Sequence, residues 1–172
     1  QECPLHAAPI AGLGWRGGMQ KFISPARAAS RDRRGIASEQ FEARGATHAL
    51  VLHSDDGLDE ISIAVPTHVA EVRNGAVREW TVDPRALGLE RADPAALAPH
   101  SLDEAAALFT NVLTGEERGA RRAMVLVNAA AALYVAGVAP SIEEGIGLAA
   151  EAIDFGRALA TFEALREKSH GR

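Results

Sequence analysis

This 172-residue sequence contains one cysteine, Cys3, few aromatic residues and no excess of positive charge. A single cysteine excludes an internal disulfide and any zinc site built from several cysteines, which is typical of a protein from a reducing cytoplasm. The formal net charge of −5 argues against a nucleic-acid binder, because neutralising phosphates requires a basic surface. The composition therefore favours small-molecule chemistry.

Long hydrophobic runs are also absent. The most apolar stretch, residues 123–139, covers 17 positions and is interrupted by Asn128 and Tyr134, so it favours a buried helix over a membrane span. Residues 1–13 lack the basic head and apolar run of a signal peptide. A hydrophobic content of 47% is enough to bury one sizeable core. We therefore expect a cytoplasmic protein with no membrane contact.

The chain divides near residue 45. Residues 1–45 scatter arginines among glycines and serines without a period of 2 or 3.6, which predicts an irregular segment. The arginines between Arg16 and Arg34 could bind a polyphosphate through their guanidinium groups. A solvated segment is the simpler interpretation, and we favour it.

Strand signals begin after this segment. The apolar run Ala49 to Leu52 predicts a strand buried on both faces. The alternation over residues 61–65, which Pro66 ends, predicts a second strand. Residues 68–73 and 76–82 flank Asn74-Gly75, the strongest short-range signal for a hairpin.

Helical patterns follow the strands. They predict helices over residues 102–113 and 120–136, with a short turn at 94–97. A third helix is expected to open after Ser141 and run towards Asp154, with Gly156 as a possible break before residues 157–168 continue it. Ser101 and Ser141 are each followed three residues later by glutamate, which forms a capping box. The order of elements predicts an α/β fold, in which a mixed β-sheet with a hairpin is covered by a C-terminal helical layer.

An acidic turn carries the clearest chemical signal. The sequence Asp-Asp-Gly-Leu-Asp-Glu at residues 55–60 places four carboxylates between two predicted strands. Such crowding is costly without a counter-charge, and Mg²⁺ prefers oxygen ligands of this kind. In open α/β sheets, ligands also bind beyond the carboxyl ends of strands. An exposed, solvated acidic loop is the alternative that the charges alone leave open.

Three other polar residues have both a structural and a functional interpretation. His53 is expected to bond a backbone group rather than to bind metal, because Mg²⁺ prefers oxygen. Asn128 lies in an apolar helix, so its amide is expected to find hydrogen-bond partners, with a place in an active-site wall as the alternative. Thr67 is expected to cap a turn, with substrate contact as the alternative.

Several of these segments together resemble the anthranilate phosphoribosyltransferases. The resemblance rests on residues 53–62, Pro66-Thr67, residues 127–137 with their Asn-Ala-Ala run, and Glu143-Glu144-Gly145, and it covers about residues 46–165. It implies that residues 46–172 form a partial phosphoribosyltransferase α/β domain, similar to the C-terminal domain of the nucleoside phosphorylase and phosphoribosyltransferase fold.

The resemblance implies an activity and a metal. In this family the amine of anthranilate attacks the anomeric carbon of phosphoribosyl pyrophosphate and pyrophosphate leaves, as a step in tryptophan biosynthesis. By position, Asp59 and Glu60 inherit the binding of Mg²⁺, which is the implied cofactor. No side-chain nucleophile is needed, so no catalytic residue is assigned. The implied partners are the two small substrates and, in the intact family, a second subunit.

The sequence also departs from the family pattern. It lacks the Gly-Thr-Gly-Gly-Asp loop that wraps pyrophosphate, no residue is assigned as the anthranilate-binding arginine, and Ser54 stands where the family usually has glycine. Backbone N–H groups of such a loop supply most of a phosphate site. We therefore expect this chain alone to be inactive. A non-catalytic remnant that binds Mg²⁺ at most, and a relative of the pyrimidine nucleoside phosphorylases, are the alternatives.

Overall fold

The sheet organises the molecule. The computed structural model describes residues 21–23 and 47–170. Its four strands are ordered β1 (Lys21–Ile23), β2 (His48–Ser54), β3 (Thr67–Arg73) and β4 (Ala76–Val82). β1 pairs with β2 in parallel, whereas β2, β3 and β4 pair antiparallel. The mixed sheet with a hairpin is therefore confirmed, and β1 adds a strand inside a segment that we predicted to be irregular.

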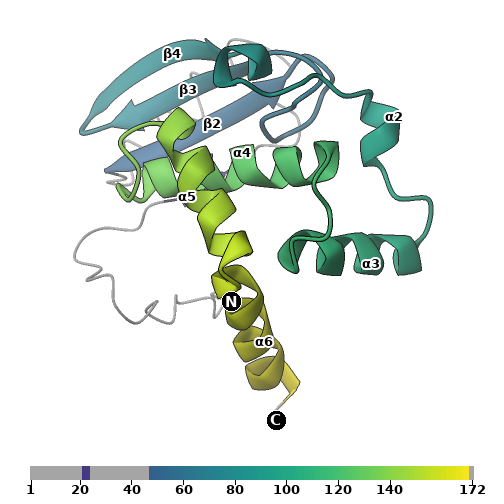
Figure 1. Ribbon diagram of the computed structural model, residues 1–172. Helices are drawn as coiled ribbons and strands as arrows, with labels where there is room; N and C mark the ends of the chain where they lie inside the picture. The colour runs from purple at the N-terminus through teal and green to yellow at the C-terminus, as the bar shows by residue number, and fades with distance from the viewer. Residues whose placement is uncertain (1–20, 24–46, 171–172) are drawn as a thin grey trace.

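The helices follow the sheet in the sequence, and the long ones lie below it in the view of Figure 1. Their bounds are η1 (Pro84–Leu87), α2 (Pro94–Leu97), α3 (Leu102–Leu113), α4 (Ala120–Val135), α5 (Ile142–Asp154) and α6 (Arg157–His170). Ser101 and Ser141 each accept a hydrogen bond from the N–H three residues on, as the capping pattern predicts. The predicted helical layer is confirmed. None of the described helices combines the length and apolar composition that crossing a membrane requires.

The core lies between the sheet and α4, which runs beneath β2 and β3 (Figure 1). The side chains of Ala49 to Leu52 in β2 are fully buried, because this strand is covered on both faces. Val127, Ala130 and Ala131 of α4 pack in one core cluster with Leu50 and Leu52, on the face of β2 that is turned towards the helix. Edge strand β4 is mostly exposed, so the burial falls off across the sheet from β2 to β4.

The strand predicted over residues 61–65 does not form. This segment is irregular, although Ile61 and Ile63 are fully buried as the alternation suggested. Ser62 between them is buried as well, so the two faces of a strand are not separated. The backbone bonds instead to side chains: Ile61 N–H to Asn128 and Ser62 N–H to Thr67. The alternating pattern therefore predicted the burial of Ile61 and Ile63 correctly, but the prediction that residues 61–65 pair as a strand was wrong.

The hairpin forms as predicted. Thr67–Arg73 pairs with Ala76–Val82, and the turn residues Asn74 and Gly75 have φ angles of 51° and 79°. A two-residue turn of this type needs positive φ at both central residues, which Asn-Gly supplies. The register places Glu71 of β3 between Leu50 of β2 and Arg78 of β4. That register sets the environment of Glu71 described below.

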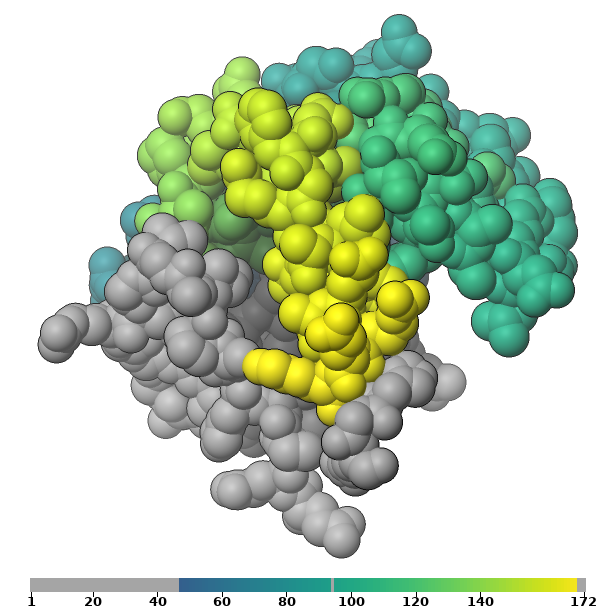
Figure 2. Space-filling view, turned by 60° about the horizontal axis from the view of Figure 1, so that its bottom comes forward, coloured from purple at the N-terminus to yellow at the C-terminus, as the bar shows by residue number. Residues whose placement is uncertain are grey.

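Close packing fixes α5 against α4. A side chain added at Gly145 would lie 2.9 Å from the carbonyl oxygen of Ala130, so only glycine fits at this crossing. The buried Arg122 of α4 also donates to both carboxylate oxygens of Asp154 at the end of α5, each at 3.0 Å. α6 lies beside α3 (Figure 2). Phe109 of α3 and Phe162 of α6 contact each other edge to face, with their ring centroids 4.8 Å apart.

Candidate functional site

The acidic turn follows β2 directly and is built around Asp56. The Asp56 carboxylate accepts hydrogen bonds from the Ser54 hydroxyl, from the Ser62 hydroxyl at 2.7 Å and from the Leu58 N–H at 3.3 Å. The Gly57 N–H closes the turn by donating to the Ser54 carbonyl at 2.9 Å. Asp56 is therefore a structural acceptor that shapes the loop.

These bonds also set the charge state of Asp56. Partial burial by itself raises the Asp56 pKa, but two serine hydroxyls and a backbone N–H favour the charged form and bring the pKa below its usual value. The carboxylate is thus held ionised and fully occupied by its own loop. Ser54 contributes one of the donors and is fully buried.

Asp55 has a different partner. Its Oδ1 lies 2.9 Å from Nε2 of His68 at the start of β3. Both side chains are about half exposed, so the pair contributes little to stability. It does occupy the carboxylate, which leaves Asp55 less free to bind a cation.

Asp59 and Glu60 are the two carboxylates of the turn that find no partner among the described residues. Within residues 21–23 and 47–170, neither makes a hydrogen bond or an ion pair. Asp59 is half-buried and Glu60 is exposed, and they are consecutive in the chain. The structure therefore divides the four carboxylates into two that are used by the fold and two that are open to a ligand, and the open pair is the one predicted to bind metal.

The backbone beneath this pair is held by Asn128 of α4. Its Oδ1 accepts from the Ile61 N–H at 2.9 Å, and its Nδ2 donates to the Ile61 carbonyl at 3.0 Å. Thr67 fixes the next residue, because its hydroxyl accepts from the Ser62 N–H at 3.0 Å. The hydrogen-bonding role expected for Asn128 and the turn-capping role expected for Thr67 are both confirmed.

The donor set of the open pair suits Mg²⁺, a hard cation that takes oxygen ligands and is usually held by one or two carboxylates, waters and substrate phosphates. Asp59 and Glu60 would be the holding residues. Among the described residues, no group of three or more His, Cys, Asp or Glu side chains is placed to bind a metal by itself. The pair would thus offer two ligands and depend on water and substrate for the others.

The bond expected from the His53 ring to a backbone group stays a prediction. The ring is half-buried at the end of β2, and within the described part of the chain it makes no hydrogen bond to a backbone group.

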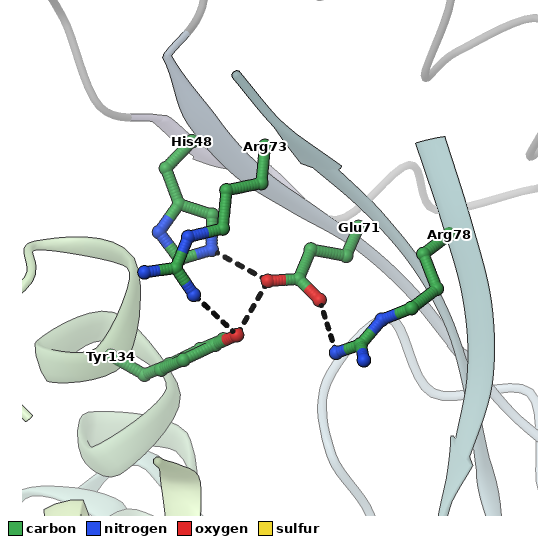
Figure 3. Close-up of polar contacts among 5 residues, drawn as sticks. All are labelled: His48, Glu71, Arg73, Arg78 and Tyr134. Atoms are coloured by element: carbon green, nitrogen blue, oxygen red, sulfur yellow. Dashed lines mark hydrogen bonds and ion pairs between the residues drawn. The ribbon is translucent and has the colours of Figure 1, made fainter. Parts of the chain in front are cut away.

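A second polar cluster lies at the opposite end of β2, around Glu71 (Figure 3). The Glu71 side chain is 2% exposed and accepts hydrogen bonds from His48 at 3.0 Å, Tyr134 at 2.5 Å and Arg78 at 2.8 Å. Arg73 donates to the Tyr134 hydroxyl at 3.2 Å and lies over its ring. Sequence reasoning missed this cluster. The available signal was the glutamate placed between apolar residues of a predicted strand.

Hydrogen bonding controls the ionisation of this cluster. Burial alone raises the Glu71 pKa, but the bonds from Tyr134, Arg78 and His48 outweigh it and leave the pKa below its usual value. Burial, together with the nearby Glu71 carboxylate, raises the pKa of Tyr134. Glu71 is therefore a charged and fully satisfied carboxylate that ties α4 to three strands.

Comparison with known proteins agrees with this architecture. Residues 29–159 match the model of the glycosyl transferase family, a/b domain. The chain is 48% identical over 126 residues to the anthranilate phosphoribosyltransferase of Rubrobacter xylanophilus and 52% identical over 126 residues to that of Thermomicrobium roseum. These matches cover 73% and 72% of this chain but only 37% and 36% of the relatives. The chain therefore spans little more than a third of the curated relatives.

A solved structure gives the same result. The anthranilate phosphoribosyltransferase of Thermus thermophilus superposes with a TM-score of 0.70 and 35% identity, covering 78% of this chain and 39% of that one. The enzyme of Saccharomyces cerevisiae in complex with PRPP and Mg shares the fold at a TM-score of 0.69, with 22% identity. The predicted resemblance to anthranilate phosphoribosyltransferases is confirmed. With its family model matched over residues 29–159, the chain belongs to the glycosyl transferase family, as an a/b domain.

Proposed function

We propose that this chain carries the Mg²⁺-binding acidic turn of an anthranilate phosphoribosyltransferase, an enzyme that transfers the phosphoribosyl group of phosphoribosyl pyrophosphate to anthranilate. The observation that carries the proposal is the division of the turn, in which the fold uses Asp55 and Asp56 and leaves Asp59 and Glu60 unpaired among the described residues. The relatives named above support the choice of reaction.

The chemistry of the transfer fits such a pair. As the bond from the anomeric carbon to pyrophosphate breaks, negative charge grows on the leaving group, and a Mg²⁺ bound there stabilises it. Asp59 and Glu60 would hold that Mg²⁺ in place. Asp56 and its serine donors keep the loop shape fixed, so the two carboxylates need little reorganisation when the substrate binds.

The sequence also supports a limit on this activity. The 172 residues contain no Gly-Thr-Gly-Gly-Asp loop, and an acidic turn without backbone N–H donors forms only part of a pyrophosphate site. We therefore propose that this chain, as it stands, binds the Mg²⁺ complex of phosphoribosyl pyrophosphate weakly and does not convert anthranilate. The second candidate is a non-catalytic chain that binds Mg²⁺ at most, and the absence of that loop from the 172 residues favours it.

Calorimetry of the chain tests the proposal. Phosphoribosyl pyrophosphate is titrated in the presence of Mg²⁺ and, separately, of EDTA. We expect heat only with Mg²⁺, and we expect the double variant Asp59→Asn with Glu60→Gln to weaken binding by about tenfold or more, since it removes both charged ligands. Equal binding by the double variant would contradict the metal assignment.

A charge-matched control separates the site from overall charge. Glu143 and Glu144, in the first turn of α5, are exposed and change the net charge by the same amount when both are replaced by glutamine. This variant is expected to bind as the unmodified chain does. Loss of anthranilate fluorescence under the same conditions reports turnover, and a rate above the uncatalysed one would contradict the proposed inactivity.

A further inference from the structure

Ile61 has a backbone that is buried without belonging to any strand. Its side chain is fully buried, and residues 59–66 form no ladder with a neighbouring strand among the described residues. A buried N–H and C=O that lack partners cost free energy comparable to lost hydrogen bonds. Asn128 supplies both partners, as the opposite residue of a β-ladder would.

The Asn128 side chain is itself held in one orientation. Besides the two bonds to Ile61, its Nδ2 donates to the Met124 carbonyl one helical turn earlier, at 3.0 Å. The amide oxygen faces a donor and the amide nitrogen faces two acceptors, so a flipped amide would lose all three bonds. We call the two bonds from Asn128 to the Ile61 backbone the Asn128 clamp. The clamp requires one orientation of the Asn128 amide as well as its position on α4.

The helix that carries this clamp is anchored to the sheet from its far end. Tyr134, six residues after Asn128 on α4, donates to Glu71 of β3 at 2.5 Å. Val127 and Ala130, which flank Asn128, are fully buried against the sheet. Asn128 thus extends from a fixed helix to a loop that has no other link to α4 by side-chain hydrogen bonds among the described residues.

The clamped residue follows Glu60 directly in the chain. The geometry points to Asn128 as a positioning residue for the Asp59 and Glu60 pair: it fixes the peptide from which Glu60 extends, and so sets where the two carboxylates meet a divalent cation. This inference rests on the proposed function, because it assigns a further residue to the same metal site. Partners that orient ligands of a metal commonly change its affinity by about 10- to 100-fold when removed.

Amide exchange tests the clamp without any metal. Hydrogen–deuterium exchange, resolved at the Ile61 amide by NMR, is expected to be slow in the unmodified chain, although Ile61 lies outside every described strand. Exchange at Ile61 as fast as at an exposed turn amide would overturn the inference. In Asn128→Ala the same amide is expected to exchange about tenfold faster or more, because its acceptor is gone. The exchange rate of Ile61 in the unmodified chain tests the inference even if Asn128→Ala does not fold.

Mn²⁺ binding, followed by the loss of the free-ion EPR signal, tests positioning. Asn128→Ala is expected to raise the Mn²⁺ dissociation constant about tenfold. The matched control is Tyr134→Phe, a substitution on the same helix that removes the bond to Glu71. It is expected to lower stability, but the buried contacts of Val127 and Ala130 still hold α4 against the sheet, so the Ile61 exchange rate and the Mn²⁺ affinity are expected to stay unchanged.

The outcomes distinguish the two proposals. If the unmodified chain binds no Mn²⁺, the proposed function fails and this inference falls with it. If it binds Mn²⁺ and Asn128→Ala loses protection at Ile61 without losing affinity, only the positioning role is overturned. An equal loss of affinity in Tyr134→Phe would show general loosening of α4 and would also overturn it.

Discussion

The carboxylates that lie near the two ends of β2 are in opposite situations. At one end Glu71 is buried and accepts hydrogen bonds from three side chains, whereas at the other Asp59 and Glu60 have no partner among the described residues. Burial of a charge is tolerated only when the charge is paired and hydrogen-bonded. The difference indicates that Glu71 holds the fold together, whereas Asp59 and Glu60 make no hydrogen bond or ion pair within the described residues.

The largest effect on stability is expected at Glu71. In Glu71→Gln the charge-assisted bond to Arg78 is lost, and the amide cannot accept from three donors as well as the carboxylate does. We expect unfolding to be easier by about 2–3 kcal/mol, as judged by urea denaturation followed by circular dichroism. A change below about 0.5 kcal/mol, the range of ordinary surface substitutions, would show that the cluster is not a stabilising anchor.

The pH dependence of stability also tests whether the Glu71 carboxylate stabilises the fold. The Glu71 pKa lies below its ordinary value of 4.5 in the folded chain, so the folded state binds this proton less readily than the unfolded state. Its contribution is present above pH 4.5 and is lost as the pH falls through the lower folded pKa. Urea midpoints measured at descending pH are expected to fall over this window and to fall less steeply in Glu71→Gln. Parallel curves for the two proteins would contradict the assignment.

Much of the fold could be predicted from the sequence, because local signals and tertiary packing agree there. Asn74-Gly75 specified the hairpin, and Ser101 and Ser141 marked two helix starts, each through bonds made within a few residues. The strand predicted around Ile61 was wrong, because the alternation there reflects the burial of side chains. The hydrogen-bond partner of the Ile61 N–H is the side chain of Asn128, which is distant in the sequence.

The candidate site was predictable only in part for the same reason. The acidic turn stood out as a run of charges, and Asp59 and Glu60 were assigned through family resemblance. Which carboxylates the loop would occupy depended on Ser62 and His68, and that required the three-dimensional structure. The Glu71 cluster joins residues from β2, β3, β4 and α4, so no local pattern described it.

A smaller effect is expected inside the turn itself. Asp56→Asn replaces an acceptor of three hydrogen bonds with a group that accepts through one oxygen only, so we expect a loss of about 1 kcal/mol. Thermal and urea unfolding measure it. Asp59→Asn, the same substitution three residues later, is the control. An equal loss of unfolding free energy in the two variants would contradict the conclusion that the fold uses Asp56 and not Asp59.

The smallest effect on stability is expected for Glu60→Gln, the counterpart of Glu71→Gln at the other end of β2. Glu60 is exposed and unpaired within the described residues, so unfolding should change by less than about 0.5 kcal/mol. Relief of repulsion from Asp59 could make the change slightly stabilising. A loss as large as that of Glu71→Gln would show that Glu60 serves the fold.

The most direct test is calorimetric titration of the chain with phosphoribosyl pyrophosphate and Mg²⁺, compared with the Asp59→Asn and Glu60→Gln double variant. The account predicts binding that requires Mg²⁺ and weakens by about tenfold or more in the double variant, while its folding is unchanged. Identical titration curves for the two proteins, or no binding by the unmodified chain, would contradict it.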